Sequence, residues 1–437
     1  MKLRQIHLLG IGCVAAATAF AGQTSVAAAQ DVPVWHSYTY EAQAETMREL
    51  IASFVAEHSG VTIDETVRSF DDLSLTLRLA LQAGNGPMVT QVNQGAKDMG
   101  TMAQAGLLIP LDDYAAKFGW GAGQSAGIID RGRWSESGQF GEGPNYGISS
   151  LGEIVGLYYN EKVLEDAGVA LPIENFQGFL DALEKVKAAG VTPIAMGTAS
   201  GNLPLHLYSA LAQSQVDAAD RGALDDLIYG RGGDFKTEAN MTAAKFLQEW
   251  SKNDYLLSGF SGISGDDAVQ LFTAGQAAFL TGGSWYFGDV QNNADIHFMP
   301  FPAPEGVSHP LSVGGVDMGW TITSLAKSQA EKDLGAEFIQ HVVSPAAAVV
   351  WARHGYLPAT SLPKESDVEL SGLLKEAIVI WDDLNANNAL GHYIDWASPT
   401  MLKTVQDNIV LLMAGRQSPE EFVGKLDADY QAFLATK

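Results

Sequence analysis

The chain has 437 residues, of which 46% are hydrophobic and 9% aromatic, so it is too long for one ordinary core and too apolar for intrinsic disorder. At roughly 100–200 residues per domain, we expect two or three domains. The 51 acidic residues against 26 basic ones give a formal charge of −25, which disfavours binding to nucleic acids and to anionic membranes.

Residues 1–29 have the three parts of a secretory signal peptide. Lys2 and Arg4 give a positive start, Leu8 to Ala21 form an apolar run, and small residues up to Ala29 form a cleavage site. The apolar run is shorter than the roughly 20 residues that a membrane-spanning helix needs. We therefore expect cleavage after Ala29 and export to a bacterial periplasm.

Cys13 is the only cysteine of the chain. A lipoprotein signal anchored at Cys13 is the alternative, but it is disfavoured because Gly10 stands where such signals have an aliphatic residue. Cleavage after Ala29 leaves no cysteine, which excludes disulfides, thiolate metal sites and a cysteine nucleophile. No later segment resembles a membrane span, so we expect a soluble protein after export.

Strands and helices alternate in the first part of the exported chain. Apolar residues at helical spacing, such as Met47, Leu50 and Phe54, predict helices, and the alternation at 61–67 predicts a strand. The predicted strands are 32–35, 61–67 and 88–92, and the predicted helices cover 47–55, 73–81 and 99–107. This order predicts βαβ units and a mostly parallel sheet.

The centre is less regular, because residues 119–147 hold nine glycines and are expected to form a loop. A second α/β unit then begins. Its predicted strands are 154–159, 191–196, 277–280, 298–301 and 313–322, and its predicted helices are 179–186, 244–250, 268–272, 334–342, 346–351, 371–383 and 400–414. No internal repeat of 20–50 residues is visible.

Catalytic signatures are missing from the sequence. There is no phosphate-binding loop, no zinc-protease motif and no serine-hydrolase motif. Residues 121–126 match a dinucleotide fingerprint in letters only, since they follow an amphipathic segment and not a strand. The nine histidines are scattered. We therefore expect no catalytic residue, no metal and no cofactor; a catalytic carboxylate pair stays open, although most acidic residues are expected to be surface groups.

Aromatic and polar side chains follow several predicted strands at their carboxyl ends, where open α/β sheets bind ligands. These candidates are Trp35, His36, Tyr38, Glu41, Gln91, Asn93, Trp285, Gly315 and Asp317. A tryptophan face suits the apolar face of a pyranose, and carboxylate, amide and imidazole groups bind its hydroxyls. Structural roles compete: tryptophans are more often core, Glu41 suits a helix N-terminus, and Asp71 suits an N-cap better than a sugar contact.

Four segments form an ordered set of motifs. They are YGI (146–148) continuing to LYYN (157–160), LEDAG (164–168) with Pro172 and Phe176, FTAGQAAF (272–279) with GGSW (282–285), and GYLP (355–358). Together they resemble the extracellular carbohydrate-binding components of ABC importers, the group that includes the maltose-binding protein. The resemblance covers essentially the whole exported chain.

The resemblance implies an α/β, two-lobed periplasmic-binding-protein fold of type II, in which each lobe is a mostly parallel sheet flanked by helices. It places the crossing hinge strands near 147–150, 279–282 and 313–317. After the signal peptide 1–29, the N-terminal lobe would comprise 30–147 plus 280–315, and the C-terminal lobe 148–279 plus 316–437.

The resemblance also implies a binding site and a function. Trp285 matches a sugar-stacking tryptophan, Trp35 and His36 match a ligand loop, and Glu153 matches a sugar-binding carboxylate. Further candidates, assigned to the C-terminal lobe, are Arg353 and Trp396. The expected protein is a monomer that captures a carbohydrate by hinge closure and passes it to a membrane permease, without catalysis. The alternatives are a polyamine or betaine receptor with an aromatic cage, and an exported glycosidase with two carboxylates.

Overall fold

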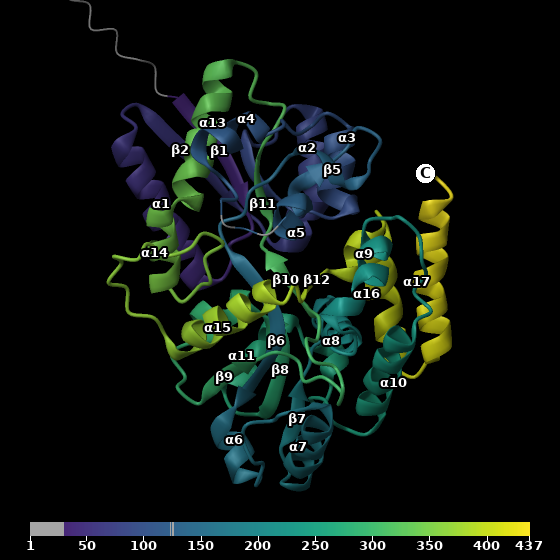
Figure 1. Cartoon of the computed structure of the whole chain (residues 1–437). Helices are drawn as coiled ribbons and strands as arrows, with labels where there is room; N and C mark the ends of the chain where they lie inside the picture. The colour runs from purple at the N-terminus through teal and green to yellow at the C-terminus, as the bar shows by residue number, and fades with distance from the viewer. Residues whose placement is uncertain (1–29, 123, 125) are drawn as a thin grey trace, which may run out of the picture.

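Two α/β lobes build the molecule, and the structure, a computed structural model, describes residues 30–122, 124 and 126–437. The predicted signal peptide lies outside the described residues. One lobe is built on a four-stranded sheet and the other on a six-stranded sheet. Figure 1 shows the first lobe above the second. This arrangement is the two-lobed α/β fold that the sequence predicts.

The first lobe has a sheet with three parallel strands and one antiparallel edge strand. In spatial order its strands are β11 (Gly319–Ile322), β3 (Val89–Val92), β1 (Gln30–His36) and β2 (Val61–Val67). Its longer helices are α1 (Glu41–Glu57), α2 (Phe70–Ala83), α13 (Gln329–Val343) and α14 (Pro345–Arg353). Val34 of β1 packs with Phe54 of α1 and Phe338 of α13 in one buried core. The apolar face of the strand therefore packs against the apolar faces of both helices.

The second lobe has a mixed sheet. Its path is β12 (Leu390–Gly391), β10 (Ser312–Val316), β6 (Gly152–Asn160), β8 (Ala277–Gly283) and β7 (Thr192–Ala195), with β9 (Ile296–Met299) also paired to β6. A mostly parallel sheet was expected, but β6 enters from the first lobe and runs antiparallel to β8, β9 and β10. Only β7 with β8 and β12 with β10 pair in parallel among the described strands of this sheet.

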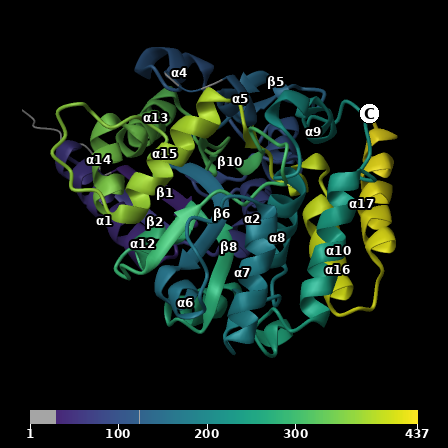
Figure 2. The same ribbon diagram turned by 60° about the horizontal axis from the view of Figure 1, so that its bottom comes forward.

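Helices surround the second sheet. They are α6 (Glu161–Asp166), α7 (Phe176–Ala188), α8 (Asn202–Gln213), α9 (Gly222–Ile228), α10 (Glu238–Lys252), α11 (Gly265–Thr273), α12 (Phe287–Val290), α15 (Gly372–Ala386), α16 (Met401–Met413) and α17 (Pro419–Leu434). Figure 2 shows α8, α10, α16 and α17 side by side along one flank. Among the described residues, no helix is both long enough and apolar enough to cross a bilayer.

The lobe boundaries differ from the predicted ones. Residues 280–315 were placed in the N-terminal lobe, but β8, β9 and β10 belong to the second sheet. Residues 316–437 were placed in the C-terminal lobe, but β11, α13 and α14 build the first lobe. The chain crosses between lobes at 148–151 and at 317–318, where crossings near 147–150 and 313–317 were expected. The expected crossing near 279–282 is wrong, because all of β8 is buried as a central strand.

Some elements have no clear sequence signal. The predicted loop 119–147 contains α5 (Ala126–Ile129) and the ribbon of β4 (Arg133–Trp134) with β5 (Phe140–Asn145). The remaining short helices of the first lobe are α3 (Thr101–Gln104) and α4 (Asp112–Phe118). Helix α8 was not predicted, because nearly all of its side chains are buried and it lacks a polar face.

Candidate functional site

A cavity of about 370 Å³ lies between the two lobes. The first lobe contributes Tyr38, which follows β1, and Asn93, which follows β3. The second lobe contributes Trp285 after β8 and Trp396 near β12. The cavity therefore lies at carboxyl ends of strands, where the side chains of loops converge and the backbone remains accessible.

Half of the predicted site residues line this cavity. They are Tyr38, Asn93, Glu153, Trp285, Asp317 and Trp396. They come from segments far apart in the sequence, so the fold brings together the groups that were selected at separate strand ends. The other predicted residues lie outside the cavity lining and have structural contacts of their own.

His36 and Gln91 are buried behind the cavity wall. The Nε2 atom of His36 lies 2.9 Å from Oε1 of Glu65, and the Tyr38 backbone N–H donates to its Nδ1 over 3.2 Å. Oε1 of Gln91 accepts from the backbone N–H of Ser37 at 2.9 Å. Both side chains thus hold the loop after β1, which carries Tyr38 into the cavity.

Trp35 and Gly315 pack against arginines. The guanidinium of Arg68 lies 3.9 Å from the centre of the Trp35 ring. Because side chains alternate along a strand, Trp35 projects to the face of β1 opposite to His36. A Cβ atom on Gly315 would overlap the Arg131 guanidinium, and Gly315 has a φ of +145°. Gly315 therefore makes room for a buried arginine.

Glu41 and Arg353 lie on the outside of the first lobe. Glu41 is exposed in the first turn of α1, where a carboxylate interacts favourably with the helix dipole. Arg353 is more than half exposed and pairs with Glu49 of α1. Its assignment to the C-terminal lobe was wrong, because α14 packs on α1.

Aromatic rings form one wall of the cavity. Trp285 follows the glycine pair of β8, and a Cβ atom on Gly283 would overlap the indole ring. The Trp285 ring centre lies 5.1 Å from that of His206 and 5.7 Å from that of Tyr286. Trp285 is only half-buried, so the glycines let the indole fold back beside the strand end with an accessible surface.

Glu153 and Asp317 form a carboxyl pair at the junction of the lobes. Burial raises the pKa of Glu153 well above its usual range, and the neighbouring Asp317 charge raises it further. Burial also raises the pKa of Asp317, against the opposing effect of the Met318 backbone N–H, which donates to it at 2.6 Å. The Tyr393 hydroxyl donates to Oε2 of Glu153 at 2.8 Å. The geometry favours a protonated Glu153 beside an ionised Asp317.

Other ionisable groups of the cavity are also perturbed by burial. Burial raises the pKa of Asp395 to about 7 and lowers the pKa of His206 to about 4. His206 is therefore neutral at physiological pH. The Nδ1 atom of His206 and the hydroxyl of Tyr38 have no hydrogen-bond partner among the described residues. Both residues line the cavity, although these two atoms are themselves buried.

Several cavity residues were not selected from the sequence. They include Tyr40, His206, Tyr286, Tyr393 and Asp395. Tyr286 adjoins Trp285, and Tyr393 and Asp395 flank Trp396, so their neighbours were a usable signal. His206 had none, because it lies on the buried helix α8.

Asp71 also lines the cavity, although an N-cap role was expected for it. The N-cap of α2 is Ser69, whose Oγ accepts from the backbone N–H of Asp72 at 3.1 Å. Asp71 is therefore free of the capping role and exposed at the cavity rim. Within the described part of the chain, no group of three or more His, Cys, Asp or Glu side chains is arranged to hold a metal ion.

Comparison with known families identifies the chain. Residues 38–349 match the model of the bacterial extracellular solute-binding protein family. The chain belongs to this family. The resemblance found in the sequence is thereby confirmed, and the matched segment includes strands and helices of both lobes.

Individual relatives are more distant. The xylose/arabinose-binding protein XacG of Haloferax volcanii is 28% identical over 159 residues, which is 35% of this chain and only 33% of XacG. The sn-glycerol-3-phosphate-binding periplasmic protein UgpB of Brucella abortus is 24% identical over 75% of this chain and 74% of UgpB. A solved chitin oligosaccharide binding protein has a TM-score of 0.79 at 22% identity, covering 93% of this chain and 99% of that protein. The structural likeness shows the fold.

Proposed function

We propose that this solute-binding protein is the periplasmic component of an ABC importer that captures a carbohydrate, either a mono- or oligosaccharide or a sugar alcohol, and delivers it to a membrane permease. The observation that carries the proposal is the half-buried indole of Trp285 in an interlobe cavity rich in polar groups. The names of XacG and of the chitin oligosaccharide binding protein support it.

The chemistry of the cavity suits a hydroxyl-rich ligand. Trp285 offers an apolar face for the C–H face of a sugar ring. Asn93, Glu153 and Asp317 offer acceptors for sugar hydroxyls. The volume of about 370 Å³ falls within the range of small-molecule sites.

Hinge closure explains how capture is coupled to transport. Contacts already join the lobes across the cavity mouth: the Tyr40 hydroxyl lies 3.4 Å from Oδ1 of Asp266, and Nε1 of Trp396 donates to Oδ1 of Asn93 at 3.1 Å. A sugar that touches both lobes stabilises the closed state by its differential affinity. The closed monomer would then dock on the permease after export by the signal peptide.

Calorimetric titration with a panel of neutral sugars tests the proposal. We expect at least one sugar to bind, and a Trp285→Ala variant to bind it at least about tenfold more weakly, which corresponds to roughly 1.4 kcal/mol. Trp35→Ala is the matched control, because Trp35 lies outside the cavity, and we expect unchanged affinity.

Three results would contradict the proposal. The first is no binding of any sugar, and the second is binding of amines alone, which would favour a polyamine or betaine receptor. The third is release of products from an oligosaccharide in large excess. That result would favour a glycosidase, with Glu153 and Asp317 as its carboxyl pair.

A further inference from the structure

The charges around the cavity have one sign. Five carboxyl groups line it, and the described lining residues include no lysine and no arginine. The carboxyl groups are those of Asp71, Glu153, Asp266, Asp317 and Asp395. His206 adds no positive charge, because burial lowers its pKa to about 4. An incoming ligand therefore meets acceptors and negative charge, without a fixed cation.

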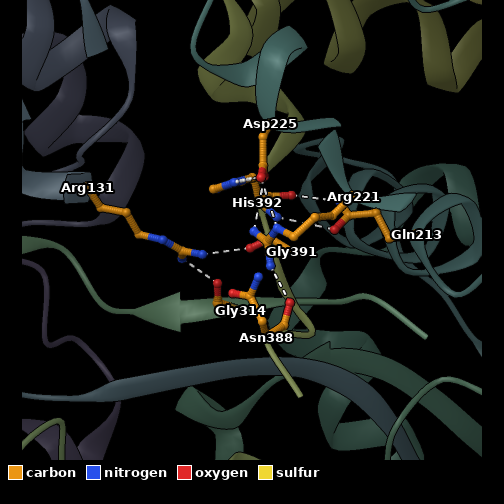
Figure 3. Close-up of polar contacts among 8 residues, drawn as sticks. All are labelled: Arg131, Gln213, Arg221, Asp225, Gly314, Asn388, Gly391 and His392. Atoms are coloured by element: carbon orange, nitrogen blue, oxygen red, sulfur yellow. Dashed lines mark hydrogen bonds and ion pairs between the residues drawn. The ribbon is translucent and has the colours of Figure 1, made fainter. Parts of the chain in front are cut away.

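The buried cation Arg131 lies outside the cavity lining. Arg131 donates to the backbone carbonyls of Gly314 and Gly391, the latter at 2.7 Å, as Figure 3 shows. It makes no ion pair with another described residue within 4.0 Å. Its charge partly offsets that of Glu153 from behind. Two nitrogens of Arg131 donate to carbonyls, its Nε has no hydrogen-bond partner among the described residues, and the side chain is not part of the cavity lining.

Another arginine near this region is also occupied. Figure 3 shows Arg221 beside Asp225, with Nε and Nη2 donating to the two carboxylate oxygens at 2.9 and 3.0 Å. The same carboxylate lies 2.8 Å from Nε2 of His392. The ammonium of Lys97, which is also outside the cavity lining, donates to Ser74 at 2.9 Å. Arg221 and Lys97 therefore bind to other side chains of the protein and do not line the cavity.

Tyr38 and Asp317 lie side by side in the lining of the cavity. The Tyr38 side chain is 2% exposed, and its hydroxyl has no hydrogen-bond partner among the described residues. It lies close to Asp317, whose charge raises the Tyr38 pKa further after burial. A sugar hydroxyl can donate to Asp317, whereas an anionic oxygen can only accept.

We infer that the cavity selects sugars by charge: it takes neutral or amino sugars and rejects sugar acids and sugar phosphates, with Asp317 as the residue that determines this. The inference rests on the proposed function and narrows its ligand class. A buried anion without a cationic partner is costly beside like charges, whereas a hydroxyl or ammonium group donates to them. This selectivity sets the chain apart from UgpB, whose name specifies a phosphate ester.

Matched ligand sets test the inference. Once a neutral sugar binds, its 2-amino, uronic acid and phosphate derivatives are titrated at near-neutral pH. We expect the amino sugar to bind at least as tightly as the neutral sugar, and both acids to bind at least about 100-fold more weakly. Equal affinity for the neutral sugar and its uronic acid would overturn the inference and leave the proposed function standing.

The variant Asp317→Asn identifies the residue responsible. We expect it to reduce the neutral-over-acid preference at least about tenfold. Glu153→Gln should change this preference little, because the amide replaces a carboxyl group that is already protonated. Asp64→Asn is the control, because Asp64 is an exposed carboxylate of β2 outside the cavity. An unchanged preference in folded Asp317→Asn would overturn the role of Asp317. Since the wild-type ligand sets need no variant, a variant that does not fold leaves the selectivity testable.

Two outcomes separate the inference from the proposed function. Binding of diamines or betaines with no sugar binding would overturn the proposed function and support the exclusion of anions. Binding of sugar phosphates alone would overturn the inference. The ligand would then still be a carbohydrate derivative, but a phosphorylated one. No binding of any probe overturns both.

Discussion

Asp395 illustrates how a single cavity residue is tuned by its surroundings. It lies in the short turn next to Trp396, is 8% exposed, and has no cationic partner in an ion pair among the described residues. Burial raises its pKa to about 7, and the nearby Asp98 contributes in the same direction. The group therefore favours a proton in the folded protein more strongly than in the unfolded chain.

This shift predicts a pH dependence of stability. The folded pKa of about 7 exceeds the unfolded value, so the contribution is present below about pH 4 and is lost as the pH rises to about 7. At 1.36 kcal/mol per pKa unit, the loss is on the order of 2–4 kcal/mol. In Asp395→Asn, the unfolding free energy should fall less over this range than in wild type.

Denaturant titrations of the ligand-free protein at several pH values measure this difference. Glu153 and Asp317 titrate in the same direction, because burial raises the pKa of both. A residual slope is therefore expected in the variant, and the difference between the two curves isolates Asp395. Asp64→Asn should follow wild type. Identical slopes for Asp395→Asn and wild type would mean that Asp395 is not perturbed.

Candidate residues could be predicted only where a local pattern exposed them. Tyr38, Asn93 and Trp285 follow apolar strands, and that position is visible in the sequence. Trp35 was selected for the same reason. However, β1 continues to His36, so Trp35 is still part of the strand, and the alternation of side chains directs it to the face of the sheet opposite to His36. His206 carries no such pattern, since its place in the cavity depends on how a wholly buried helix packs.

At the scale of elements, the end of β8 shows how glycines shape the site. A Cβ atom on Gly283 would come within 1.9 Å of the Trp285 ring, and one on Gly282 within 2.8 Å of the Tyr286 ring. Both rings therefore fold back over a strand end that has no side chains of its own. The sequence shows the glycine pair, but it does not show that the missing Cβ atoms make room for the two aromatic rings.

We predict that Gly283→Ala displaces the indole and weakens sugar binding at least about tenfold. Calorimetry measures the affinity, and a thermal melt shows whether the fold is retained. Gly222→Ala is the matched control, because a Cβ atom at Gly222 of α9 would have no neighbour within 4 Å. Full affinity in a folded Gly283→Ala variant would mean that the indole is not positioned by this contact.

Elements with strong periodicity were predicted well, whereas their sheet membership was not. Amphipathic helices such as α1 and α7 reveal themselves by one apolar face. Strands β8 and β11 are both short, apolar and wholly buried, so nothing local distinguishes them. Their assignment depends on pairing with β6 and with β3, which are far away in the sequence. The lobe boundaries failed for this reason.

At the scale of the whole molecule, the account requires that both lobes hold the ligand. The cavity draws its walls from both sheets, and the chain crosses between them at 148–151 and 317–318. Asp317, which forms the carboxyl pair with Glu153, lies on one of these crossings. The position of the site at the hinge links ligand contacts directly to the relative placement of the lobes.

The most direct test of this claim is a crystal structure with the sugar that binds best in calorimetry. We expect its ring against Trp285, its hydroxyls bonded to Asp317 and Asn93, and contacts from both lobes. A sugar bound outside this cavity, or held by one lobe alone with Trp285 uncovered, would contradict the account.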